Sequence, residues 1–451
     1  MPSLRRVPLL LVLALALGAV ATAGSLAKST NSPPSPGSLT SSKNTESTAL
    51  YCTGLTDAKH YAAGHVTFLN TSNSSRSLNV QVISNTSSRA STTIELPAYG
   101  SHAIQPQSLV SGNYFAVAAQ VSGGGVVAEE LANGGITQTP CTSAGVTDWY
   151  GAGFNTSVGS SGDLSIYNPT ATPAVFNVSI YAPGGFSAPA PFQGMAVGAH
   201  SLLEVNLGAQ IVSTDNVGVH VKVLRGSIII TGTQASGLVT SFNAGSLALS
   251  KTIWFPRVTT ASGAMAQLRV FNMSSLPADV NVSVSLGDFK IAPESVTVAP
   301  YSSGVVVITP NSAIPAAGYA AVKLTSNVPI GVALATGTTA GLALAAPVAI
   351  SNEFIISDFS GRGFDAATLT NTSKKSIKVT FTVIGRGKSG TSVSTEISGS
   401  STSAVLGLFA GLSTLKGHTL MITSSKPSLV VSTTLPSKPV GITVVNPLDR
   451  R

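Results

Sequence analysis

One pattern of strand, asparagine turn and strand recurs four times along this chain, and it limits the possible folds more than any other feature. The turn asparagines are 98, 104 and 99 residues apart. A repeat of about 100 residues predicts four similar domains rather than one large one. The four copies, in register, are Val66–Val82 (VTFLNTSNSSRSLNVQV), Leu164–Ile180 (LSIYNPTATPAVFNVSI), Leu268–Val284 (LRVFNMSSLPADVNVSV) and Ala367–Val383 (ATLTNTSKKSIKVTFTV), with their asparagines at Asn70, Asn168, Asn272 and Asn371.

The second strand of each copy alternates in a way that predicts one buried face. The residues eight, ten and twelve positions after each asparagine are all apolar: Leu78, Val80, Val82; Phe176, Val178, Ile180; Val280, Val282, Val284; and Val379, Phe381, Val383. Because side chains alternate between the two faces of a strand, each triplet should enter a core. The first strand should supply the same core with Phe68, Ile166, Val270 and Leu369.

The asparagine suits a turn for two reasons. Its side chain hydrogen-bonds nearby backbone, and it tolerates a left-handed conformation.

Composition supports an all-β chain. Charged residues are only 9% of the 451, and Val, Thr, Ser, Ala and Gly are abundant, which favours strands and turns. No sustained helical stripe follows the N-terminus. Each repeat ends with a strand that should break at a Ser, Gly or Pro step and resume, in the segments 115–129, 217–231, 320–334 and 420–433. About seven short strands per 100 residues predict tandem immunoglobulin-like β-sandwiches, about four in number.

The predicted organisation is an N-terminal leader, a linker and four sandwiches. A basic pair, Arg5 and Arg6, an apolar run Val7–Val20 and the small residues Ala21-Thr22-Ala23 indicate a signal peptide over residues 1–23, with an uncleaved N-terminal anchor as the alternative. A disordered Ser/Thr/Pro-rich linker should cover residues 24–50. The sandwiches should span 51–144, 145–248, 249–349 and 350–451.

Two cysteines, Cys52 and Cys141, bracket the first repeat. In an exported chain an even cysteine count predicts a disulfide. Two buried free thiols are the alternative. A bridge would tie the start of the first sandwich to its exit rather than cross-link the two sheets as in antibody domains.

The segment Leu164–Gly185 (LSIYNPTATPAVFNVSIYAPGG) carries a family resemblance. With the leader and the serine-rich linker, it resembles a family of secreted proteins of unknown function from actinobacteria and their relatives, which have tandem sandwich repeats. The resemblance implies a bacterial envelope or extracellular setting. It brings no catalytic or binding residues.

Motifs for catalysis or cofactor binding are absent from the sequence. The six histidines form no H-E-x-x-H, and no nucleophile elbow, phosphate loop or dinucleotide-binding glycine pattern occurs. His60 and His65 near Asp57 are the strongest metal candidates, but a zinc site needs three or four ligands, and a solvated loop is the simpler interpretation. We therefore expect no catalytic residue, no metal and no cofactor.

The charge distribution is uneven. Residues 350–451 hold eleven Lys and Arg against five acidic residues, whereas residues 24–349 hold twelve of each. The basic excess in the last repeat has two interpretations: a solvated domain whose charge aids solubility, which is the simpler one, and contact with an anionic surface. The candidate contact residues are Arg362, Lys374, Lys375, Lys378, Arg386 and Lys388. Lys374 and Lys375 occupy the asparagine turn, and Arg386 and Lys388 follow the strand Val379–Ile384, so these two pairs should lie at opposite ends of that strand.

The sequence thus favours an exported, non-enzymatic cell-envelope or extracellular protein that presents binding or spacer surfaces. Its partners would be an anionic envelope polymer, lipid headgroups or a membrane protein complex, and not nucleic acid, since basic and aromatic residues are not interleaved. Two alternatives stay open. One is a secreted hydrolase or carbohydrate-handling accessory protein, and the other is an adhesin or surface-layer-like structural protein.

Overall fold

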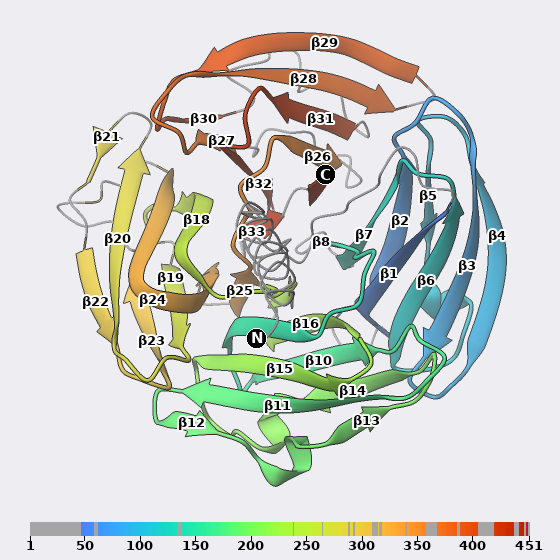
Figure 1. Ribbon diagram of the computed structural model, residues 1–451, viewed down its shortest axis with the longest axis horizontal. Coiled ribbons are helices and arrows are strands. Elements are labelled where there is room, and N and C mark those ends of the chain that lie inside the picture. Colours follow the sequence, from blue (N-terminus) through green and yellow to red (C-terminus); the bar gives the residue numbers. More distant parts are fainter. Residues whose placement is uncertain are drawn as a thin grey trace, which may run out of the picture. The chain divides into compact units, whose positions relative to one another are not determined.

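The computed structural model describes residues 47–57, 62–132, 138–237, 239–263, 265–286, 289–291, 294–308, 314, 318–338, 341–357, 368–385, 388–404, 419–436, 442–445 and 448–449. The regular structure of these residues is strand, apart from three short 3-10 turns, and every strand pairing is antiparallel. The strands form four two-sheet sandwiches in chain order (Figure 1). The all-β, multi-sandwich prediction is therefore confirmed. The predicted leader, 1–23, lies outside the described residues.

The first sandwich pairs two four-stranded sheets, ordered β1-β6-β3-β4 and β5-β2-β7-β8. One 3-10 turn, η1 (Pro106–Ser108), follows β5. The strands are β1 (Ser47–Thr56), β2 (Gly64–Asn70), β3 (Arg76–Ser84), β4 (Arg89–Leu96), β5 (Ser101–Ile104), β6 (Tyr114–Ser122), β7 (Val126–Ala132) and β8 (Gln138–Pro140).

β1 starts earlier than the sequence suggested. Ser47 to Leu50 pair with Ser122 to Ala119 of β6, although the prediction placed residues 24–50 in a disordered linker. Backbone hydrogen bonds of the ladder hold the polar residues Ser47 and Thr48, and Leu50 adds a buried side chain to the core of the first sandwich.

The second sandwich has sheets ordered β12-β11-β15-β9 and β14-β10-β16-β17, with β13 also paired to β11. Two 3-10 turns, η2 (Ala190–Phe192) and η3 (Leu207–Ala209), belong to it. The strands are β9 (Asp148–Phe154), β10 (Ser160–Tyr167), β11 (Ala174–Ala182), β12 (Gly185–Ser187), β13 (Met195–Val197), β14 (Leu202–Asn206), β15 (Val217–Arg225), β16 (Ile229–Ser236) and β17 (Val239–Asn243).

In the third sandwich a single strand serves both sheets. β24 pairs with β20 as far as Ser326 and with β18 as far as Ile330, and from Gly331 onward it pairs with β19 and β25. The strands are β18 (Ser250–Thr259), β19 (Met265–Asn272), β20 (Ala278–Leu286), β21 (Phe289–Lys290), β22 (Glu294–Val298), β23 (Ser302–Val307), β24 (Tyr319–Thr338) and β25 (Gly341–Ala345).

The predicted break in segment 320–334 is therefore wrong. Pro329 lies within the strand, because its ring fixes a φ angle compatible with extended backbone and only removes one hydrogen-bond donor. In the other three segments a turn separates two strands, as expected: β6 and β7, β15 and β16, and β31 (Thr419–Ser424) and β32 (Leu429–Pro436).

The fourth sandwich has sheets ordered β29-β28-β31-β26-β34 and β30-β27-β32-β33. Its strands are β26 (Glu353–Ser357), β27 (Thr368–Asn371), β28 (Ile377–Gly385), β29 (Lys388–Ile397), β30 (Thr402–Ala404), β31 (Thr419–Ser424), β32 (Leu429–Pro436), β33 (Ile442–Val445) and β34 (Leu448–Asp449).

The predicted core residues are buried in all four sandwiches. All twelve residues of the alternating triplets, and Phe68, Ile166, Val270 and Leu369, are at most 6% exposed. Each set packs in the core of its own sandwich. Burial of a large aliphatic or aromatic side chain stabilises a fold by roughly 1.5–3 kcal/mol, so these positions account for much of what holds each sandwich together.

Each turn asparagine is fully buried and joins two turns. Asn70 Nδ2 donates to the carbonyls of Ser74 (2.7 Å) and Pro97 (3.0 Å), and its Oδ1 accepts from the Ser72 amide (2.9 Å). The other asparagines repeat these bonds with Thr172, Gly198 and Thr170; with Leu276, Ala299 and Ser274; and with Lys375, Ser398 and Ser373.

The left-handed conformation lies in the turn opposite each asparagine. The residues with positive φ are Tyr99 (56°), His200 (49°), Tyr301 (50°) and Ser400 (56°). Each donates its amide to the turn that follows an asparagine, as Tyr99 does to the Ser72 carbonyl at 3.1 Å. The asparagine therefore acts through its side chain and not through a left-handed backbone.

Contacts between sandwiches differ from one pair to the next. Tyr51 of the first packs on Tyr167 of the second, with ring centroids 6.1 Å apart. Arg269 of the third donates to the Gly153 carbonyl of the second at 3.1 Å, and also to the Asp215 carbonyl. Trp254 of the third packs against the core of the fourth. Ile355 and Ile384 of the fourth belong to the apolar cluster of the first.

Candidate functional site

The asparagine turn of the fourth sandwich presents lysines to solvent. Asn371 is buried, and its Nδ2 donates to the Lys375 carbonyl at 2.9 Å, which holds the turn backbone in place. The side chains of Lys374 and Lys375 are exposed in the turn. Lys378, the second residue of β28, is exposed as well. The turn thus presents three cations around one buried asparagine.

A second turn adds a fourth lysine that the sequence analysis missed. Lys426 is exposed in the turn between β31 and β32. That turn lies against the start of β28, because the Ser425 amide donates to the Lys378 carbonyl at 2.9 Å and Ser425 Oγ accepts from the Lys378 amide at 3.2 Å. We call Lys374, Lys375, Lys378 and Lys426 the lysine cluster. Its fourth member could be found only from the pairing of β28 with β31.

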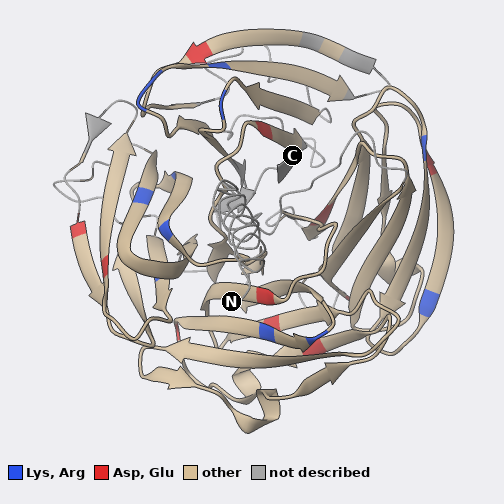
Figure 2. Ribbon diagram, in the orientation of Figure 1, with Lys and Arg blue, Asp and Glu red and all other residues tan. Residues whose placement is uncertain are grey.

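Acidic residues lie on two strands next to the cluster. Glu396 of β29 is the cross-strand partner of Lys378, and both side chains are exposed. Glu353 of β26 is half-buried and pairs with Thr423, just before the turn that carries Lys426. Two carboxylates beside four lysines leave the cluster with a net positive charge. Figure 2 shows blue segments at the end of β28 that follows the asparagine turn, in a molecule where charged residues are sparse. The arrangement can bind anionic groups by electrostatic attraction, without covalent chemistry.

The other predicted contact residues are placed only in part. Lys388 begins β29, so its backbone lies at the end of β28 away from the lysine cluster. Arg362 and Arg386 lie outside the described residues. Of the residues predicted at the far end of β28, only the backbone of Lys388 is placed there.

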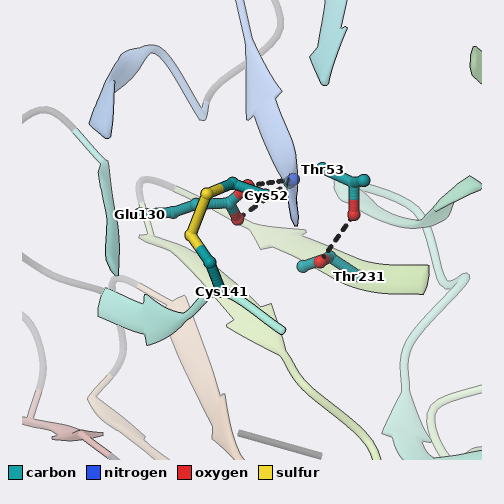
Figure 3. The surroundings of a disulfide bond; sticks show 6 residues. Cys52, Thr53, Glu130, Cys141 and Thr231 are labelled. Atoms are coloured by element: carbon teal, nitrogen blue, oxygen red, sulfur yellow. Dashed lines mark hydrogen bonds between the residues drawn. A yellow bond between two sulfur atoms is a disulfide. The ribbon is translucent and has the colours of Figure 1, made fainter. Parts of the chain in front are cut away.

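The predicted disulfide is present. Cys52 on β1 bonds Cys141, which follows β8, and their Cα atoms are 4.7 Å apart (Figure 3). The bond ties the start of the first sandwich to its exit, as predicted. Disulfides persist in oxidising compartments, so the bond indicates an extracytoplasmic environment. The chain-entropy description gives about 4–5 kcal/mol for closing a loop of this size.

A buried carboxylate lies beside the disulfide. Glu130 of β7 is 1% exposed and accepts from the Gly54 amide through both oxygens, at 2.8 and 3.0 Å (Figure 3). Burial raises the pKa of Glu130 to about 8, against the opposing effect of the Gly54 and Thr53 amides. Thr53 Oγ1 also donates to Thr231 Oγ1 of the second sandwich at 2.8 Å. The Glu130 carboxylate thus ties β7 to β1 within the first sandwich, and the bond between Thr53 and Thr231 joins β1 to the second sandwich.

One histidine is paired with a carboxylate. His220 Nε2 lies 2.9 Å from Asp148 Oδ1, and its ring stacks on Tyr150 at 4.6 Å. Burial lowers the pKa of His220, against the opposing effect of Asp148. The bond to Asp148 and the stacked Tyr150 ring hold the imidazole against the surface of β9 and β15.

No group of three or more His, Cys, Asp or Glu side chains within the described ranges could hold a metal ion. His60 of the loop singled out in the sequence is outside those ranges. His65 lies on β2, where burial lowers its pKa. Across the same ranges, no helix is long and apolar enough to cross a membrane.

Comparison with known proteins gives a family match and weak structural likenesses. Residues 115–407 match the sequence model of a family of unknown function, DUF5719. No curated protein matches the chain.

Two solved structures show limited similarity. The crystal structure of Thermotoga maritima 1070 is 18% identical, covers 22% of this chain and 92% of its own, and has a TM-score of 0.20. A tetra-tandem repeat from the extending region of a large adhesion protein is 11% identical over 89% of this chain and 99% of its own, with a TM-score of 0.11. Likenesses at these TM-scores support no inference about fold or function.

Proposed function

Since the chain belongs to the DUF5719 family, whose function is unknown, we propose a role from its own surface: a non-enzymatic cell-envelope or extracellular protein that binds an anionic polymer through the lysine cluster. The observation that carries this proposal is the meeting of two turns, which gathers Lys374, Lys375, Lys378 and Lys426 beside only two described acidic residues of the neighbouring strands, Glu396 and Glu353.

The rest of the chain supports a binding rather than a catalytic role. The disulfide is suited to an oxidising compartment, where envelope polymers are found. The sandwiches contact one another through buried side chains such as Arg269, so the cluster is carried on a connected scaffold. A cluster of cations on a scaffold gains affinity from several weak contacts to a repeating polyanion.

The test is a charge reversal. The variant with Lys374, Lys375 and Lys378 all changed to Glu should sediment less with anionic envelope material at low salt, and should elute from a heparin column at lower salt than the native chain. The matched control carries Lys222→Glu, Arg225→Glu and Lys251→Glu. These residues are exposed in the second and third sandwiches, so the net charge changes equally. Equal weakening by both variants, or none by the first, would contradict a site at the lysine cluster.

A further inference from the structure

The sheet β1-β6-β3-β4 has an outer face that the second sandwich covers only in part. At one end, Ile83 and Ala116 pack against Tyr167, Leu202 and Ile229 of the second sandwich. Beyond that contact the face is open. It forms the floor of a groove with a cavity volume of about 570 Å³, walled by Tyr167, Pro169 and His200. A volume in the range of about 300–1,000 Å³ is typical of small-molecule sites.

The strand register arranges the floor in two rows. One row reads Ala49, Gln120, Asn79 and Thr93 across β1, β6, β3 and β4. The next row reads Tyr51, Ala118, Gln81 and Ser91 across the same strands. The small side chain of Ala118 lies between those of Tyr51 and Gln81. The second row therefore has a depression at Ala118, bordered on one side by the ring of Tyr51.

The floor offers neutral hydrogen-bonding groups. Asn79, Gln120 and Thr93 are exposed, and Gln81 is half-buried. An amide side chain both donates and accepts, and a hydroxyl does so too. Some of this capacity is used within the sheet, since Thr93 Oγ1 donates to Asn79 Oδ1 at 3.2 Å and Gln120 Nε2 donates to Ser47 Oγ. Asn79, Gln81 and Gln120 all line the groove.

An aromatic ring borders these amides. Tyr51 is half-buried, and its ring is held against Tyr167 at a centroid distance of 6.1 Å. A ring held by a neighbour presents a surface to a ligand at little cost in side-chain entropy. Flat aromatic surfaces attract the partly positive C–H groups of another molecule because the ring face is negative.

Formal charge is confined to the margins of the groove. Its lining contains no Lys, Arg, Asp or Glu. Arg89 and Glu95, both exposed on β4, lie beyond opposite ends of the lining, and Arg89 Nη2 donates to the His200 carbonyl at 2.9 Å. An anionic ligand would therefore find no cation on the floor to pair with, and a lipid chain would find amides in place of an apolar surface.

We propose that this groove binds a neutral saccharide. Sugar hydroxyls, which donate and accept, match the paired amides of Asn79, Gln81 and Gln120. The C–H face of a pyranose ring matches the exposed side of Tyr51. This site differs in place and in chemistry from the lysine cluster, so one chain would hold a neutral glycan and an anionic polymer at once.

Calorimetric titration of the full chain with cellobiose, maltotriose and N,N′-diacetylchitobiose tests the proposal. At least one should bind with one site per chain. The substitutions Gln120→Ala and Asn79→Ala lie on exposed strand positions and should each weaken that binding, and Tyr51→Ala should weaken it about tenfold or more. Tyr51→Phe keeps the ring and should retain most of the affinity.

Tyr301→Ala is the matched control, because Tyr301 is an exposed tyrosine of the third sandwich, and this change should leave saccharide binding as it is. No saturable binding of any of the three saccharides overturns the proposal. Binding that survives both Gln120→Ala and Tyr51→Ala also overturns it. The lysine-cluster variant should bind saccharide normally, so the two proposals fail independently.

Discussion

The asparagine turns and the contacts between sandwiches are built in opposite ways. Asn70 and Asn371 lie in the first and fourth sandwiches, yet their side chains donate to carbonyls four and twenty-seven residues later and accept from the amide two residues later. The sandwich contacts share no such pattern. Arg269 is a buried cation of the third sandwich that donates to carbonyls of the second, whereas Thr53 of the first sandwich donates from its hydroxyl to the Thr231 hydroxyl of the second.

The asparagine turns repeat one set of hydrogen bonds, and the contacts between sandwiches do not, because the two kinds of feature join different surfaces. A turn that closes two strands of one sandwich needs the same few hydrogen bonds each time, so the same residue recurs. A contact between sandwiches joins two different outer faces, so each is made by side chains that occur once. The variants below separate the two kinds of feature, from the largest expected effect to the smallest.

Removing a turn asparagine should have the largest effect. Asn70→Ala leaves the Ser74 and Pro97 carbonyls and the Ser72 amide without their partner, and we expect a loss of about 3–5 kcal/mol in the free energy of unfolding of that sandwich. Asn73→Ala, three residues later at an exposed position of the same turn, should cost less than about 0.5 kcal/mol. Urea denaturation measures both. Equal costs would show that the buried side chain is dispensable.

Removing the Arg269 side chain should weaken the contact between the second and third sandwiches more than it weakens either sandwich alone. Arg269→Met keeps much of the side-chain volume but leaves the Gly153 and Asp215 carbonyls unpaired, at a cost of about 2–3 kcal/mol. The calorimetric transition should broaden or split as the second and third sandwiches unfold less cooperatively. Arg76→Met, which removes a bond to Gly124 inside the first sandwich, is the control and should leave that shape unchanged. A single sharp transition in the Arg269 variant would argue against coupling through this residue.

Glu130 should make stability fall as pH rises. Burial raises its pKa in the folded chain to about 8 from the ordinary value of 4.5, so the folded state holds the proton more tightly than the unfolded state. Stability from this group is therefore full below about pH 4.5 and declines through pH 8, by at most about 1.4 kcal/mol per pH unit. Glu130→Gln, which cannot ionise, should flatten the thermal unfolding midpoint between pH 5 and pH 8.5. The same slope in native and variant protein would assign the pH dependence to other groups.

The repeated features were predictable, and the unrepeated ones were not. The alternating triplets and the four asparagines recur in register, so composition and spacing alone identify the cores. The Cys52–Cys141 pair followed from cysteine count and the predicted exported setting. The burial of Glu130 and Arg269 depends on which outer faces meet, and no local pattern marks it. Lys426 joins the lysine cluster only because β31 pairs with β28.

The immunoglobulin-like strand order, the leader over residues 1–23 and the non-enzymatic role stay predictions. The basic excess of the last repeat is the sequence property that leads to the lysine cluster. The saccharide groove could not be anticipated, because its floor and its wall come from different sandwiches.

β24 has a mechanical consequence. In the first, second and fourth sandwiches a turn separates the strand of one sheet from the strand of the other, and such a turn can work as a hinge under load. In the third sandwich one unbroken backbone of 20 residues passes from sheet to sheet. Sliding one sheet past the other would break the pairing of that strand with β18 and β20 or with β19 and β25. We therefore expect the third sandwich to resist such sliding more than the other three.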